Sequence, residues 1–218
     1  MLPTFIRQDL LSTALTHRSA LNESTATESN ERLEFLGDAV LELVTTEFLY
    51  AKFPSEPEGM LTSYRAALVK TTTLAVVAKE LGLDQLLKIS KGEERSGGRD
   101  NVGLLADTFE AFTGALYLDQ GYEAAKVFIS TNLLPKVDQV VTQKLYKDYK
   151  TSLQEQVQSQ GQGTPIYETI EESGPDHLKV FTVQVLVDQN ILGAGTGRNK
   201  QDASQEAARA ALEKMKDL

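Results

Sequence analysis

The chain has 218 residues, of which 41% are hydrophobic and 24% charged, and no apolar run approaches the ~20 residues that a membrane-spanning helix needs. Its 31 acidic and 22 basic side chains give a formal charge of −9, which argues at first sight against nucleic acid, because phosphate binders generally carry a basic surface. With no cysteine and two histidines, disulfides and thiolate sites are excluded and carboxylates are the main reactive groups. The opening "MLPTFIRQDLL" has no signal-peptide pattern, so we expect a cytoplasmic protein that does not span a membrane.

The first part of the chain predicts an all-α domain over residues 1–134. Apolar residues recur three and four positions apart in segments 9–21, 31–53, 59–83 and 101–120, which is the period of amphipathic helices. The stretches "FPSEPEG" and "RSGGRDN" between them are rich in turn-forming residues. Residues 135–147 are expected to be a connector, with a helix after Pro135.

The pattern changes from about Asp148. A short polar helix stopped by glycines is followed by runs that alternate in period two at 166–172 and 178–188, and by the glycine-rich segment "ILGAGTGRNK". The last segment, 200–218, is alanine-rich and helical by propensity. Residues 148–218 therefore predict a small α+β domain of order α-β-β-β-α.

Three acids lie in the segment "NERLEFLGDAVLEL" at residues 30–43. At ~100° per residue, Glu31, Glu34 and Asp38 form one stripe within about 60° of Glu34. We expect this helix to bury its opposite side, and Gly37, which is unfavourable in a helix, suggests a close approach of another backbone. The apolar residues assigned to that buried side are Leu36, Val40 and Leu43.

A second acidic pair, Asp107 and Glu110, lies on the segment "ADTFEAF", with Leu104, Phe109 and Phe112 available for burial. Two helices that each present carboxylates can converge on an all-oxygen site, which suits magnesium or manganese. Such ions can activate water and stabilise the transition state of phosphodiester hydrolysis. The spacing leaves a second interpretation open, in which the acids are solvated helix faces.

Five blocks in chain order resemble ribonuclease III, the double-stranded RNA endonuclease, in its bacterial form with one nuclease domain. They are "ALTHRSALNE", "NERLEFLGDAVLEL", "EGMLTSYRAALV", "SGGRDNVGLLADTFEAFTGALYLDQGYEAA" and the C-terminal α-β-β-β-α segment. The resemblance covers nearly the whole chain. It implies an all-α nuclease domain followed by a double-stranded RNA-binding domain.

By this resemblance, four acids, Glu34, Asp38, Asp107 and Glu110, hold the catalytic divalent ions, with Asp38 and Glu110 as active-site residues. Glu31 and Glu58 match accessory acids, although Glu58 in the loop "SEPEG" also fits an exposed turn acid. For His17 and Arg18, in "THRS", we favour packing and helix-end hydrogen bonding over catalysis.

The resemblance also assigns residues that contact RNA. Polar side chains on the first C-terminal helix would face a minor groove, a loop histidine would reach another, and the start of the last helix would contact phosphate. One departure weakens this match, because Gln201 stands where the family typically has a second lysine. The implied RNA-binding residues are Thr151, Gln154, Glu155, Gln158, His177, Arg198, Asn199 and Lys200.

The implied function is hydrolysis of double-stranded RNA with Mg²⁺, or Mn²⁺ as a substitute, by a homodimer. It would leave 5′-phosphate and 3′-hydroxyl ends with short 3′ overhangs, in the processing of ribosomal RNA, mRNA and other RNAs. Two alternatives remain: a non-catalytic relative that binds RNA, against which the presence of all four acids argues, and an acidic helical protein with no role in RNA.

Overall fold

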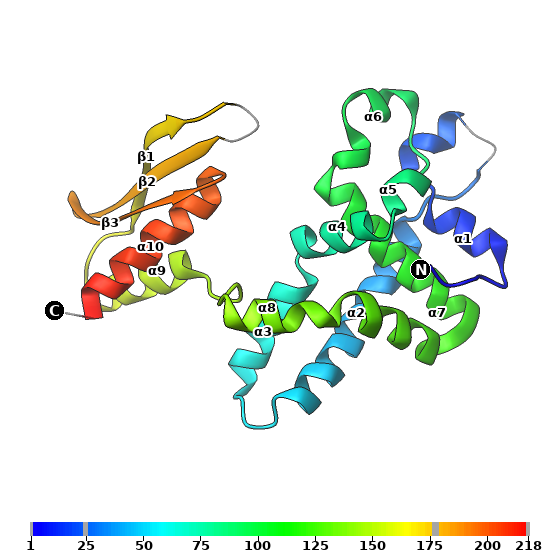
Figure 1. Cartoon of the computed structure of the whole chain (residues 1–218), viewed down its shortest axis with the longest axis horizontal. Helices are drawn as coiled ribbons and strands as arrows, with labels where there is room; N and C mark the ends of the chain where they lie inside the picture. Colours follow the sequence, from blue (N-terminus) through cyan, green and yellow to red (C-terminus); the bar gives the residue numbers. More distant parts are fainter. Residues whose placement is uncertain (1, 24–25, 176–178, 217–218) are drawn as a thin grey trace. The chain divides into compact units, whose positions relative to one another are not determined.

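The computed structural model describes residues 2–23, 26–175 and 179–216 (Figure 1). The chain forms two compact units, residues 1–146 and 147–218. Within the described ranges, no helix combines the length and the apolar character needed to cross a membrane.

The first unit is helical, as predicted. Its long helices are α2 (Glu31–Lys52), α3 (Glu58–Val69), α4 (Thr71–Glu80) and α7 (Val102–Asn132). Its shorter elements are α1 (Gln8–Ala14), η1 (Arg18–Glu23), α5 (Leu83–Leu86), α6 (Lys91–Arg95), η2 (Gly98–Asp100), η3 (Leu134–Lys136) and α8 (Val137–Thr142).

Three helix boundaries differ from the prediction. The expected helix over 9–21 is divided into α1 and the 3₁₀ segment η1, and the expected helix over 59–83 is divided at Lys70, whose backbone is extended (φ −63°, ψ 146°). In contrast, α7 continues past residue 120 to Asn132, with a kink at Gly121. Gly121 has φ 82°, which glycine adopts without the steric cost of a side chain.

The core of the first unit is centred on α2 and α7, which pack along one another (Figure 1). Leu41 and Val44 of α2 meet the fully buried Phe109 and Phe112 of α7 in a core cluster that also includes α4. A second cluster joins the end of α2 to α3 and α8; it comprises Leu49, Tyr64, Ala67, Leu68, Val137 and Val140.

The expected connector, residues 135–147, lies mostly within the first unit. Its helix α8 packs on α3 through Val137 and Val140. Beyond it, the ring of Tyr146 lies edge-on to that of Tyr64, with 4.8 Å between the ring centroids.

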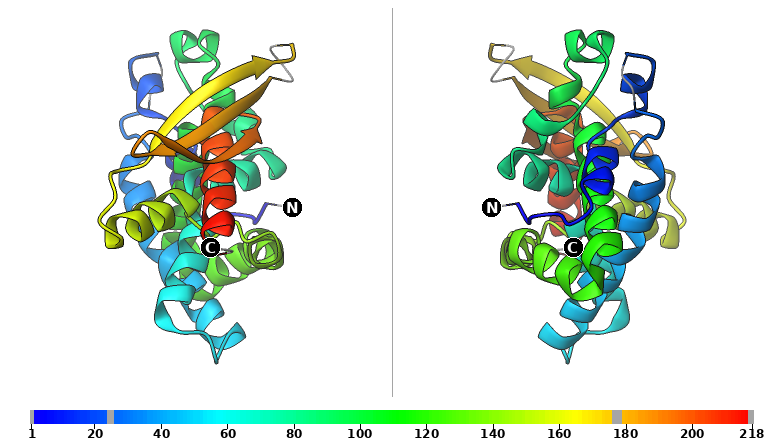
Figure 2. Two further views of the ribbon diagram at one scale, coloured as in Figure 1. Left: turned by 90° about the vertical axis from the view of Figure 1, so that its left-hand side faces the viewer. Right: turned by 90° about the vertical axis from the view of Figure 1, so that its right-hand side faces the viewer.

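The second unit has the predicted α-β-β-β-α order: α9 (Tyr149–Ser159), β1 (Ile166–Ser173), β2 (Val180–Val187), β3 (Asn190–Gly197) and α10 (Lys200–Lys216). The strands form an antiparallel sheet of order β1-β2-β3, and both helices pack on one face of it (Figures 1 and 2). Val183 and Val185 of β2 are buried against Leu153 of α9 and alanines of α10. The predicted fold class is therefore confirmed.

Candidate functional site

The backbones of α2 and α7 approach each other closely at two glycines. A Cβ atom added to Gly37 would lie 1.8 Å from the carbonyl oxygen of Glu110, and one added to Gly114 would lie 2.2 Å from that of Leu33. Both distances are far below van der Waals contact, so only glycine permits this crossing. The crossing places residues 34–38 of α2 beside residues 107–114 of α7.

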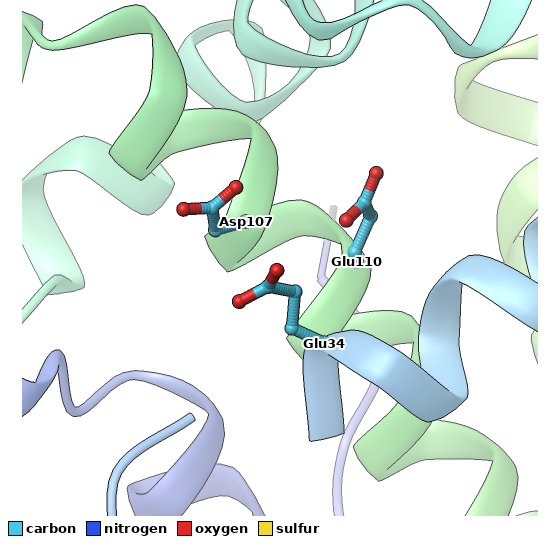
Figure 3. Close-up of side chains that lie close together, drawn as sticks. All are labelled: Glu34, Asp107 and Glu110. Carbon is cyan, nitrogen blue, oxygen red and sulfur yellow. The ribbon is translucent and has the colours of Figure 1, made fainter. Parts of the chain in front are cut away.

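Three of the predicted acids meet at this crossing. Glu34 of α2 and Asp107 and Glu110 of α7 each offer a carboxylate oxygen within 4.8 Å of the other two (Figure 3). The three side chains are half-buried, and among the described residues none of them forms an ion pair with lysine or arginine. The group therefore concentrates negative charge without a lysine or arginine partner among the described residues.

The local environment raises the pKa values of all three carboxyl groups. Burial is the main cause at each, and for Glu110, where Asp38, Asp107 and Glu34 add repulsion, the pKa rises from 4.5 to about 8. For Glu34 the additional repulsion comes from Asp107, Glu31 and Asp38, in that order. At Asp107, burial is partly offset by the nearby His17.

The donor set fits a divalent cation. Three carboxylates from two helices provide the oxygen ligands that Mg²⁺ and Mn²⁺ prefer, and because all three are only half-buried, water can reach them. A bound cation would also stabilise the ionised carboxylates, whose pKa values burial raises, and would relieve the repulsion that adds to the shifts of Glu34 and Glu110. Charge relief and ligand type thus point to the same occupant.

The remaining acids are placed differently. Asp38 is exposed and lies outside the group of three, although it is close enough to raise the pKa of Glu110. Glu31 is also exposed; its carboxylate accepts a hydrogen bond from the Ser29 hydroxyl at 2.7 Å and pairs with Arg18 at 3.6 Å. Glu58 begins α3, where it accepts from the Thr62 hydroxyl, and it is not in the group either.

His17 makes hydrogen bonds and also acts electrostatically on the site. Its Nδ1 lies 2.9 Å from the Ser19 hydroxyl oxygen and accepts from the Ser19 backbone N–H, and that same oxygen accepts from the N–H of Ser90. These bonds join the N-terminal segment to the loop before α6. His17 also acts to lower the pKa of Asp107, which could not be predicted from residues 90 positions apart in the chain.

The start of α7 is fixed by its own sequence. The side chain of Asn101 accepts hydrogen bonds from the backbone N–H groups of Gly103 and Leu104, at 2.9 and 3.2 Å. This is an N-cap, which satisfies amide groups that have no partner in the first turn. It starts the helix one turn before Asp107, so the site acids lie in its regular part.

The buried side of α2 is not the predicted one. Val40 is buried, but Leu36 is only half-buried and Leu43 is 53% exposed. The buried stripe instead runs through Leu33, Gly37, Leu41 and Val44, next to Glu34 rather than opposite it. The prediction failed because it assumed that acids face away from the core, whereas here they line the edge of the α2–α7 contact. Likewise, Leu104 is half-buried on α7, and its neighbour Leu105 is buried.

The side of α2 opposite its buried stripe carries Phe35, which at 83% is the most exposed aromatic side chain among the described residues. It borders a hollow of about 720 Å³ that also includes Leu10, Leu36 and Leu118. Arg7 and Glu28 are among the charged residues of its rim. Sequence reasoning did not single out Phe35, because its spacing on the helix does not distinguish an exposed residue from a core one.

In the second unit, the polar residues assigned to the first helix lie on the exposed side of α9, and Leu153 and Val157 are buried on its other side. At the start of α10, Arg198, Asn199 and Lys200 are exposed. His177 lies outside the described residues. The exposed residues of α9 are Thr151, Gln154, Glu155 and Gln158.

Comparisons with known proteins agree with this architecture. The sequence profile described as Ribonuclease-III-like matches residues 7–137, and that of the double-stranded RNA binding motif matches residues 149–215. The chain is 48% identical over 207 residues to Ribonuclease 3 of Streptococcus gordonii, covering 94% of this chain and 89% of that protein. It is 47% identical over 213 residues to Ribonuclease 3 of Bacillus licheniformis, covering 97% and 85%.

Solved structures give the same result for the fold. The nuclease domain of ribonuclease III from Campylobacter jejuni superposes with a TM-score of 0.56 at 43% identity, over 61% of this chain and 90% of that one. Dicer from Pichia stipitis matches with a TM-score of 0.50 at 29% identity, over 97% of this chain and 96% of the Dicer chain. Since the sequence matches extend over both units, the chain belongs to the ribonuclease III family.

Proposed function

We propose that this endoribonuclease of the ribonuclease III family hydrolyses double-stranded RNA with the help of divalent cations held at the α2–α7 crossing. The products would carry 5′-phosphate and 3′-hydroxyl ends with short 3′ overhangs, and the work would be the maturation of ribosomal RNA, mRNA and other transcripts in the cytoplasm. The observation that supports this most directly is the convergence of Glu34, Asp107 and Glu110.

In this mechanism Glu34, Asp107 and Glu110 would hold the cation, with Asp38 as a further ligand. Bound Mg²⁺, or Mn²⁺ in its place, supplies positive charge that stabilises the transition state and acidifies the attacking water. Glu110 has to release its proton to act as a ligand, because its pKa without the ion is about 8. No side chain forms a covalent intermediate, so the carboxylates act by binding and orienting groups.

Asp38 and Glu110 are the residues that we assign to the active site. Glu110 lies at the centre of the repulsion among the acids, and Asp38 stands on the exposed side, where a substrate phosphate has access. We assign accessory roles to Glu31 and Glu58. Neither residue belongs to the group of three within a single chain.

The decisive test compares the wild type with Glu110→Gln on a long RNA duplex, with and without Mg²⁺. We expect cleavage only by the wild type with Mg²⁺, and a large loss of activity in the variant because a neutral amide replaces the most buried ligand. Glu123→Gln is a matched control, since this exposed acid lies on the same helix outside the group. Duplex binding without cleavage under all metal and salt conditions would support a non-catalytic RNA-binding protein instead.

We further propose that the first unit forms a homodimer through the face of α2 that carries Phe35. A protruding ring and an adjacent hollow of about 720 Å³ on one face are suited to a twofold contact, in which each subunit inserts its ring into the other's hollow. One related structure is described as showing flexibility in a region involved in dimer formation. Phe35→Ala should give a folded monomer by light scattering, because an exposed ring contributes little to the subunit's own stability; an unchanged dimer would contradict this interface.

In the second unit, we propose that the exposed side of α9 faces a minor groove of the duplex and that the start of α10 contacts phosphate. Polar side chains such as Gln154 and Gln158 can meet 2′-hydroxyl groups, which mark RNA in that groove. His177 belongs to the same proposal as a contact to a second minor groove. Substituting Gln158 by alanine should weaken binding to RNA duplexes of different sequences by similar factors, because the groove is read by shape.

A further inference from the structure

The first lysine of α10 is engaged within the protein. The Lys200 ammonium lies 2.8 Å from one carboxylate oxygen of Glu172 on β1 and 5.6 Å from the centre of the Phe181 ring on β2. The other oxygen of Glu172 lies 3.9 Å from the ammonium of Lys179. Hydrogen bonding from Lys200, followed by the charges of Lys200 and Lys179, lowers the pKa of Glu172 and keeps it ionised.

The basic residues at the start of α10 are Arg198 and Lys200. Gln201 follows Lys200, and Asp202 comes next in the same turn. The side-chain amide of Asn199 donates to the Asp202 carboxylate and accepts from the Asp202 backbone N–H, both at 2.8 Å. This amide is therefore already used to cap α10. Residues 147–218 together carry 8 basic and 11 acidic side chains. Lys200 and Arg198 therefore supply the positive charge that this end of α10 can offer to a phosphate.

A carboxylate and an RNA phosphate are both anionic hydrogen-bond acceptors, so they compete for the same ammonium group. Lys200 is 61% exposed, so a phosphate can reach it, but the Glu172 carboxylate would repel that phosphate or would have to be displaced. We infer that Glu172 is an internal competitor for RNA phosphate at Lys200 and holds the affinity of this unit for duplex RNA below what its basic residues allow. This inference rests on the proposed RNA-binding function.

The test uses the full chain and a labelled RNA duplex longer than the ~16 base pairs that such a domain spans. Binding is followed by fluorescence anisotropy without divalent cations, so that no cleavage occurs, at a series of KCl concentrations. Glu172→Gln should bind about twofold to fivefold more tightly than the wild type at low salt, as expected for loss of one exposed ion pair. The gain should shrink as KCl rises, because salt screens both contacts.

Two further variants separate competition at Lys200 from a general effect of charge. Glu171→Gln removes the same charge one residue away on β1, and should give a clearly smaller gain. In a Lys200→Gln background, Glu172→Gln should give no gain, because the two residues act as a coupled pair. Equal gains from Glu171→Gln and Glu172→Gln, or a gain that persists without Lys200, would overturn the inference. Failure of the wild type to bind duplex RNA even at low salt would overturn the proposed function, and this inference with it.

Discussion

Replacing Gly37 by alanine should separate the two helices that carry the acidic site. The added Cβ would lie 1.8 Å from the Glu110 carbonyl oxygen, 2.6 Å from the carbonyl carbon and 2.9 Å from the Gly114 nitrogen. These are all backbone atoms, which cannot rotate away as a side chain can. Reaching ~3.4 Å, where ordinary van der Waals contact begins, requires α2 and α7 to move apart by about 1.6 Å.

The expected cost falls more on the site than on the fold. Overpacking destabilises by about 1–3 kcal/mol, and alanine returns ~1 kcal/mol because it favours the helix more than glycine does. A metal site, however, tolerates errors of only ~0.2 Å in its ligand distances, so a shift of more than an ångström between Glu34 and Glu110 should disrupt it. We expect cleavage to fall by about 100-fold or more, with a decrease in Mg²⁺ affinity and a net destabilisation of about 0–2 kcal/mol.

Three measurements test this reasoning together: thermal unfolding, calorimetric titration with Mg²⁺, and single-turnover cleavage of duplex RNA. Gly59→Ala on α3 is the matched control, because nothing lies within 4 Å of the Cβ that it adds. The control should retain full activity. If Gly37→Ala bound Mg²⁺ and cleaved RNA as the wild type does, the close helix crossing would not be what assembles the site.

Three other predictions follow from single side chains. The folded state holds the Glu110 proton up to about pH 8, whereas the unfolded state releases it near pH 4.5, so the metal-free protein should lose stability as the pH rises between these values. In thermal unfolding, saturating Mg²⁺ or Glu110→Gln should flatten this dependence. An equally steep loss in the variant would contradict the assignment. The fully buried Thr45 hydroxyl has no hydrogen-bond partner among the described residues, so Thr45→Val should stabilise the protein by ~1 kcal/mol in urea unfolding. A loss of stability would mean that the hydroxyl does form a hydrogen bond in solution. Asn101→Ala removes the N-cap of α7 and should destabilise by ~1 kcal/mol, while Asn101→Asp, which can still accept both bonds, should not.

Much of the fold could be read from local patterns. The helical period predicted the segments of the first unit. Alternation in period two predicted two strands of the second unit, and the glycine-rich extended segment predicted the third. Helix boundaries were less predictable, because the break at Lys70 depends on backbone angles that no proline or glycine marks in the sequence. The predicted end at residue 120 was also wrong, because α7 bends at Gly121 and continues to Asn132.

The sequence by itself determined that the acids lie on two helices, and that Gly37 would need a reason to stand among them. Only the tertiary structure decided that Glu34, Asp107 and Glu110 converge while Asp38 stays exposed, and that Phe35 protrudes although Leu41 is fully buried. Helical periodicity defines the direction of each side chain around its own axis, but it carries no information about which neighbour that side will meet. That choice is made where Gly37 and Gly114 let two backbones come together, since the contact depends on residues that are 77 positions apart in the chain.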